Sequence, residues 1–363
     1  MRATIAVVLL LSAANALADI SIDELVRDAG LREGAVAISE SPRWQGARKV
    51  LLARLAAEEV DALRAQMPDT EFVVVASEAD AVKEAANADA ILGLCSERLL
   101  AAAPRLVWVQ IYWAGAESCL RVPRVASGDV VLTNMQKMSS PTIGEHAIAM
   151  TLALARSLPV YAKGMESGAH RELYTADMTM TSLPGKTMLV VGLGGIGTET
   201  ARRAAALGMR VIGTRNSSRE GPPFVDYVGL SDELLELAGQ ADVIVNALPL
   251  TGATRGLLDD AFFDAARKGA YFVNVGRGAT VDTDALLAAL QDGRIAGAGL
   301  DVTDPEPLPV DHPLRFIPNV IITPHVAGRG GERGRHRLLR AENLRRYAAG
   351  EALLNVVDPA RGY

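Results

Sequence analysis

A glycine turn between an apolar run and a helical pattern constrains this chain most. Residues 188–191 read Met-Leu-Val-Val, and the turn Gly192-x-Gly194-x-x-Gly197 follows directly. A helical pattern at 198–207 and a second predicted strand at 209–213 come next. This order of strand, turn, helix and strand is that of a dinucleotide-binding βαβ unit. We expect the glycines to allow the tight turn, a close approach to pyrophosphate and helix–strand packing, with the positive end of the helix dipole facing the phosphates. The alternative is an ordinary βα turn.

The loop after the second strand bears on the choice of cofactor. In an NAD site an acidic residue about 20 positions after the glycines binds the ribose 2′-hydroxyl. Here Arg215 takes that place, Asn216 and Ser217 follow, and no carboxylate occurs before Glu220. An acid would repel a 2′-phosphate, whereas Arg and hydroxyl groups can hydrogen-bond it. The sequence therefore predicts that NADP(H) is preferred and that NAD(H) is the weaker alternative, unless these residues form only a solvated loop.

Composition indicates a globular protein of two domains. The chain has 363 residues, of which 49% are hydrophobic and 22% charged, so it can bury a large core. Its net charge of −6 and its aromatic fraction of 4% argue against a nucleic-acid partner. Cys95 and Cys119 lack metal-ligand or CxxC spacing, so we expect no metal site and interpret both as buried free thiols. A disulfide is the alternative if the protein is exported.

The N-terminus resembles a secretory signal. Met1-Arg2 is followed by an apolar run from 3 to 14 and by Ala16-Leu17-Ala18, a small-residue cleavage pattern. We expect residues 1–18 to be a signal peptide and the mature chain to be exported, for example to the periplasm. A buried first strand in a cytoplasmic protein is the alternative. The run is too short to span a bilayer well, and no later segment is apolar enough, so we expect no membrane partner.

Strand and helix patterns alternate through the rest of the chain. Such alternation predicts an α/β fold with parallel sheets. The predicted strands are 49–52, 72–76, 90–94, 106–112, 130–133, 188–191 and 209–213. The predicted helices are 22–26, 56–67, 79–86, 141–158, 198–207 and the Arg-rich stretch 331–349. The helix at 141–158 is expected to act as a hinge between the two α/β units.

Three polar residues follow apolar runs downstream of the glycine turn. Arg277 lies in the segment 272–278, Glu306 in 299–307 and His325 in 320–328, and each segment begins in an apolar strand and ends in a polar loop. Strand ends of a doubly wound sheet converge on its ligand crevice, so these side chains are expected to meet beside the nicotinamide. Arg277 can bind a carboxylate and polarise a ketone oxygen. His325 can exchange the proton, and Glu306 can orient the imidazole. Each residue alone also has a purely structural interpretation.

These motifs together resemble the D-isomer-specific 2-hydroxyacid dehydrogenases. The resemblance rests on Gly192–Gly197, Asn246–Thr251, Asn274–Gly278, Asp304–Pro307 and Thr323–Gly328. It implies two Rossmann-like domains, with the active site in the cleft between them. A flavodoxin-like substrate domain would comprise 19–137 and 327–363, and an inserted NAD(P)-binding Rossmann domain would comprise 138–326. Homodimers are usual in such proteins.

The resemblance also implies roles for individual residues. Arg277, Glu306 and His325 would carry the chemistry, and Ala114 and Gly115 would bind the substrate carboxylate through backbone N–H groups. Asp301 would lie near the nicotinamide amide. The expected cofactor contacts are Gly192, Gly194, Gly195, Ile196, Gly197, Arg215, Asn216, Ser217, Leu248, Pro249, Val275, Gly276, Asp301 and Gly328. Two positions depart from the family pattern: Trp113 is bulky where a small residue is common, and Gly195 replaces an arginine of the glycine turn.

Arg215 and the stretch Trp113–Leu120 resemble the glyoxylate/hydroxypyruvate reductase branch. The sequence thus predicts NAD(P)H-dependent reduction of a small 2-oxo acid to the D-2-hydroxy acid. Two alternatives stay open at this point. One is a dehydrogenase for another 2-hydroxy acid, and the other is a non-catalytic cofactor-sensing protein on the same scaffold.

Overall fold

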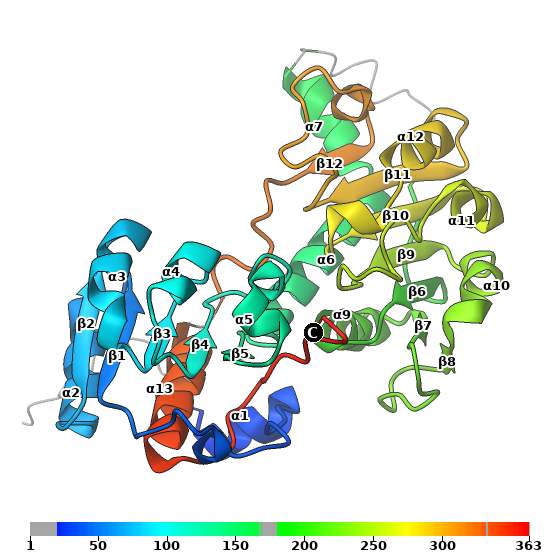
Figure 1. The fold of residues 1–363 in the computed structure, drawn as a ribbon. Coiled ribbons are helices and arrows are strands. Elements are labelled where there is room, and N and C mark those ends of the chain that lie inside the picture. The colour runs from blue at the N-terminus through cyan, green and yellow to red at the C-terminus, as the bar shows by residue number, and fades with distance from the viewer. Residues whose placement is uncertain (1–19, 167, 169–179, 332, 363) are drawn as a thin grey trace, which may run out of the picture.

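The computed structural model describes residues 20–166, 168, 180–331 and 333–362. The predicted signal segment, 1–18, lies outside the described residues. Figure 1 shows two lobes, joined by α6 (Ser140–Ala155) and by the strand-to-helix crossing after β12 (Val320–Ile322). Across the described ranges, no helix is long and apolar enough to cross a membrane.

The first lobe is built on a parallel sheet in the order β2-β1-β3-β4-β5. This is the flavodoxin-like order predicted for the substrate-binding part. Its strands are β1 (Lys49–Ala53), β2 (Glu71–Val75), β3 (Ala90–Leu92), β4 (Trp108–Gln110) and β5 (Val131–Thr133). Its helices include α2 (Ala57–Gln66), α3 (Glu78–Glu84), α4 (Glu97–Ala101) and α5 (Pro123–Ala126).

The second lobe holds a parallel sheet in the order β12-β11-β10-β9-β6-β7-β8. Read from β6, this is the Rossmann order 3-2-1-4-5-6 with one more strand. The strands are β6 (Thr187–Val191), β7 (Arg210–Thr214), β8 (Tyr227–Gly229), β9 (Val243–Asn246), β10 (Ala270–Asn274), β11 (Ile295–Leu300) and β12. The helices include α7 (Leu158–Glu166), α9 (Gly195–Ala206), α10 (Leu234–Ala238), α11 (Asp260–Ala265) and α12 (Thr283–Gln291). Short 3-10 turns are η1 (Ile38–Glu40), η2 (Ala85–Asn87), η3 (Cys119–Arg121), η4 (Ser231–Glu233), η5 (Gly278–Thr280) and η6 (Pro313–Phe316). The α/β fold with two Rossmann-like sheets is confirmed.

Both ends of the described chain pack on the first lobe. Helices α1 (Ile22–Ala29) and α13 (Arg333–Ala349) lie there together (Figure 1). The Tyr347 ring lies 5.1 Å from that of Trp108, and its hydroxyl donates to the Asp89 carbonyl at 3.0 Å. Backbone bridges then join Leu354 to Glu33 and Val356 to Thr133. The C-terminal segment therefore completes the core that the first 137 residues begin.

Cys95 and Cys119 form a disulfide, so the expectation of free thiols was wrong. Their Cα atoms lie 5.6 Å apart, and the two residues are 24 positions apart in the chain. Cys95 follows β3 and Cys119 begins η3 beyond β4. Because β3 and β4 are neighbouring parallel strands, their C-terminal loops emerge at the same edge of the sheet. Sequence spacing alone gave no sign of this proximity.

We predict that the double variant Cys95→Ser/Cys119→Ser has a lower free energy of unfolding than the oxidised protein, by about 3 kcal/mol. The disulfide closes a loop of 24 positions, and this constraint on the unfolded chain is lost in the variant. Urea denaturation measures the difference. Equal stability of the two proteins under non-reducing conditions would contradict the prediction.

Candidate active site

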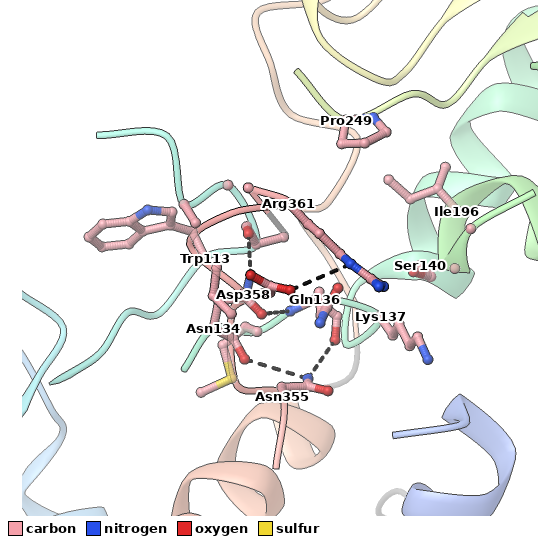
Figure 2. A pocket seen from close by; sticks show the side chains of 18 of the residues that line it. Trp113, Asn134, Gln136, Lys137, Ser140, Ile196, Pro249, Asn355, Asp358 and Arg361 are labelled. Atoms are coloured by element: carbon pink, nitrogen blue, oxygen red, sulfur yellow. Dashed lines mark hydrogen bonds and ion pairs between the residues drawn. The ribbon is translucent and has the colours of Figure 1, made fainter. Parts of the chain in front are cut away.

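A cleft of about 2910 Å³ lies between the lobes. The glycine turn and the ends of β9, β10 and β11 line one side, and the loop after β4 and the C-terminal segment line the other. Figure 2 shows side chains from both lobes facing into it. Pockets for single small molecules are typically about 300–1,000 Å³, so the cleft has room for a dinucleotide and a substrate together.

The glycine turn has the geometry expected of a dinucleotide site. Gly192 has φ 94°, in the left-handed region that glycine adopts readily. A Cβ on Gly197 would lie 2.1 Å from the Gly192 carbonyl oxygen, so α9 packs on β6 only with glycine there. A Cβ on Gly194 would meet no atom within 4 Å, which leaves open space above the turn. Helix α9 begins at Gly195, earlier than the predicted 198, so its first N–H groups lie within the turn itself.

The cleft wall after β7 carries an arginine without an ion-pair partner among the described residues. Arg215, Asn216 and Ser217 line the cleft, and the Arg215 Nε is buried without a hydrogen-bond partner among the described residues. The nearby Arg219 does not line the cleft, because it pairs with Glu233 at 2.8 Å. Hydrogen bonds from Arg219 and Tyr227 lower the pKa of Glu233 to about 2. An unpaired guanidinium beside hydroxyl and amide groups fits a phosphorylated ribose.

Buried amides hold the loops after β9 and β10. The Asn246 Nδ2 donates to Asn274 Oδ1 at 3.0 Å and to Thr280 Oγ1 at 2.7 Å. The Asn246 side-chain oxygen accepts the N–H of Leu248, and the Asn274 side-chain oxygen accepts the N–H of Gly276. This network fixes a stretch of the cleft wall. The expected cofactor residues Gly192, Gly194, Gly195, Ile196, Leu248, Pro249, Val275, Gly276, Asp301 and Gly328 all line the cleft, whereas Gly197 does not.

Arg277 reaches across the cleft to the loop after β4. Its Nε donates to Glu117 Oε1 at 3.0 Å, and both side chains are about two-thirds buried, with 27% and 32% exposed. A Cβ on Gly115 would lie 2.5 Å from the Arg277 Nη2, so the guanidinium lies directly against this backbone and would have to shift for a larger residue. The Asn134 amide donates to the Ala114 carbonyl at 2.6 Å and holds this loop. The structure thus brings Arg277 to the loop with Ala114 and Gly115, as predicted, and adds Glu117, which the sequence reasoning missed.

His325 and Glu306 form a pair at the cleft. The His325 Nδ1 lies 2.7 Å from Glu306 Oε1, and 51% of the His325 side chain is exposed. His325 lines the cleft, whereas Glu306 is not among the residues that line it. The carboxylate therefore fixes the ring orientation and leaves Nε2 to face the cleft.

Comparison with known proteins agrees with these features. The family model of the D-isomer specific 2-hydroxyacid dehydrogenase NAD binding domain matches residues 148–327. The chain is 32% identical to a glyoxylate reductase of Korarchaeum cryptofilum over 309 residues, 83% of this chain and 90% of the relative. A glyoxylate reductase of Aeropyrum pernix is 35% identical over 76% of this chain and 85% of its own length. The chain belongs to the D-isomer-specific 2-hydroxyacid dehydrogenase family.

Solved structures of this family have the same fold. An NADPH-dependent glyoxylate/hydroxypyruvate reductase of Sinorhizobium meliloti, in complex with NADP and sulfate, matches with a TM-score of 0.73 and 27% identity. The match covers 87% of this chain and all of that one. A family member from Xanthobacter autotrophicus, in complex with NADPH, matches with a TM-score of 0.72 and 29% identity over 88% of this chain and all of its own. The predicted family is thus confirmed, and the protein is an oxidoreductase with the NAD-binding domain of these enzymes.

In this dehydrogenase Asp301 holds the loop that carries His325. Its carboxylate, in a side chain only 3% exposed, accepts from Thr323 Oγ1 at 2.6 Å and from the N–H groups of Val326 and Ala327 at 2.9 and 3.0 Å. His146 of α6 adds a 3.1 Å contact between its Nε2 and Thr323 Oγ1. The sequence did not predict this role for His146, because the contact joins residues 177 positions apart and the sequence shows only that His146 lies in an apolar helix.

We predict opposite behaviour of two glycine variants of the dehydrogenase. Gly197→Ala places a Cβ against backbone, so unfolding free energy should fall by roughly 1–3 kcal/mol or more. Gly194→Ala meets open space, so stability should change by less than about 0.5 kcal/mol while NADPH binding weakens. Thermal denaturation and fluorescence titration with NADPH measure both effects. If Gly194→Ala binds NADPH like the parent, the space above the turn is not a cofactor site.

Proposed function

We propose that this dehydrogenase reduces a small 2-oxo acid to the D-2-hydroxy acid with NADPH. The observation that carries the proposal is the meeting of Arg277, the Gly115 loop and the His325–Glu306 pair in the cleft that also holds the glycine turn. The residues present fit a phosphorylated dinucleotide, because Gly194 leaves open space and the Arg215 Nε has no hydrogen-bond partner in the described part of the chain.

Arg277 is the proposed substrate-binding and polarising residue. When bound, NADPH supplies the hydride. The guanidinium of Arg277 would bind the substrate carboxylate and withdraw charge from the ketone oxygen, together with the N–H groups of Ala114 and Gly115. Glu117 holds the guanidinium above this loop before substrate binds. The substrate carboxylate would then compete with Glu117 for Arg277.

His325 is the proposed acid. The Nδ1 that faces Glu306 is kept occupied, so the proton is delivered from Nε2 to the substrate oxygen as the hydride reaches the carbonyl carbon. In the reverse direction the same nitrogen would take the proton. Glu306 stabilises the imidazolium in both directions.

Glyoxylate and hydroxypyruvate are the proposed substrates. Relatives named glyoxylate reductase and glyoxylate/hydroxypyruvate reductase match most of the chain, and Trp113, 45% exposed, stands beside the substrate loop and would limit its space. NADP(H) is the proposed cofactor because the buried Arg215 Nε has no partner within the described ranges and related structures carry NADP or NADPH. NAD(H) remains the weaker alternative.

We further propose that the enzyme is exported and forms a homodimer, with substrate-binding parts at 19–137 and 327–363 and a cofactor-binding part at 138–326. The disulfide between Cys95 and Cys119 supports export, since such bonds persist in oxidising compartments. The signal pattern in the first 18 residues supports it too.

The first prediction from this function concerns turnover. The protein starting at Asp19 should oxidise NADPH in the presence of glyoxylate or hydroxypyruvate, measured at 340 nm. His325→Ala should lower kcat on the order of 100-fold or more, because the proton donor is lost, while the Kd for NADPH stays the same. Undiminished turnover in this variant would refute the role of His325. A folded parent that is inactive on every 2-oxo acid tested would refute the proposed function.

The second prediction concerns cofactor choice. Arg215→Gln should lower the ratio of kcat/KM for NADPH to that for NADH by roughly 10- to 100-fold, since a charged hydrogen bond to the 2′-phosphate is lost. Arg219→Gln is the matched control: Arg219 is paired with Glu233 outside the cleft, so the ratio should stay within about 3-fold. Equal effects of the two substitutions would exclude Arg215 as the selecting residue.

A further inference from the structure

A lysine that the preceding description does not use lies against the start of α9. Lys137 belongs to the segment between β5 and α6, and it lines the cleft. A Cβ on Gly195 would lie 2.9 Å from the Lys137 Cγ and 2.6 Å from Ser140 Oγ. Figure 2 shows Lys137 on the same side of the cleft as Ser140 and Ile196. The lysine stem therefore occupies the place that a side chain at 195 would otherwise take.

The backbone of Lys137 is strained. Its φ is 70°, in the left-handed region that costs a non-glycine residue free energy. Strain of this kind persists where the surrounding fold imposes it, and it is concentrated at ligand sites. Glycine at this position would remove the backbone strain, so the presence of lysine favours a function for its side chain.

The charge of Lys137 has no acidic partner. Its ammonium donates to the Gly30 carbonyl, and within the described part of the chain it forms no ion pair. Burial lowers its pKa, and the positive charges of Arg32 and Arg215 lower it further. Arg32, Lys137 and Arg215 all line the cleft, and none of them forms an ion pair with a described residue, an arrangement that favours a multiply charged anion.

We propose that Lys137 binds a phosphate group of the dinucleotide, from the segment that links the two lobes. The inference rests on the proposed NADPH dependence. The N–H groups at the start of α9 attract phosphate, and the Lys137 stem lies against this turn, so its ammonium could swing from the Gly30 carbonyl to a phosphate bound there. Gly195 and Lys137 act as a pair: the missing Cβ at 195 makes room for the lysine stem. The pyrophosphate and the ribose 2′-phosphate are the two phosphate sources within the cofactor.

Direct binding of reduced cofactors tests the proposal without turnover. Lys137→Met keeps the stem and removes the charge, so the Kd for NADPH should rise roughly 10- to 100-fold by fluorescence titration. If the 2′-phosphate is the ligand, the Kd for NADH stays the same; if it is the pyrophosphate, both rise together. Lys163→Met is the control, since Lys163 on α7 also donates to backbone carbonyls but lies outside the cleft. It should leave both Kd values unchanged.

The outcomes separate this inference from the proposed function. A parent that binds neither NADPH nor NADH would overturn both. A parent that binds NADPH, with a Lys137→Met variant that is folded and binds it equally well, would overturn only the role of Lys137.

Amine labelling of the unmodified protein provides a second test that needs no variant. Acetylation by a water-soluble reagent, mapped by mass spectrometry, should be slowed several-fold at Lys137 by saturating NADPH and remain unchanged at Lys163. Equal labelling of Lys137 with and without NADPH would overturn the proposal. Protection of Lys137 but not of Lys163 would support it even if Lys137→Met failed to fold.

Discussion

The buried carboxylate of Asp301 is the interaction on which the site depends most. It receives hydrogen bonds from Thr323, Val326 and Ala327, where the chain leaves the second sheet and crosses back to the first lobe. A buried carboxylate is stable only while such donors are present, so the backbone after β12 is held in the one conformation that supplies them. His325 lies within that path in a left-handed conformation, φ 54°, with its N–H on the Asp301 carbonyl. The position of the imidazole and the connection of the lobes therefore share one anchor.

The βαβ unit could be predicted from sequence because its information is local. Short strand patterns at 188–191 and 209–213, a glycine turn and a helical pattern specify β6, α9 and β7 with small errors at the ends. Arg277, Glu306 and His325 were found because each follows a strand, and strands of one parallel sheet share an edge. The same reasoning could not supply the disulfide or the contact of Arg277 with Glu117. Those pairs depend on which loops of two different strands or lobes face each other, and no periodicity encodes that.

The loop that carries Ala114 and Gly115 is held from several sides. Asn134 fixes the Ala114 carbonyl, and Arg277 covers Gly115. The disulfide at Cys119 ties the following turn to the end of β3. Because backbone N–H groups bind a carboxylate only when they are correctly aimed, this bracing reduces the reorganisation that substrate binding requires. The opposite wall is held by Asn246 and Asn274, so both sides of the cleft are ordered by polar groups rather than by apolar packing alone.

The return of α13 to the first lobe has a consequence for biosynthesis. Trp108 is fully buried, and Tyr347 is among the residues that cover it. During translation, the strands of the first sheet emerge long before that tyrosine, whereas the whole second sheet lies between them. The second lobe can therefore fold first. The apolar face of the first lobe stays uncovered until α13, which carries Tyr347, has been synthesised. A nascent chain of this dehydrogenase would need protection from association until its last helix has docked.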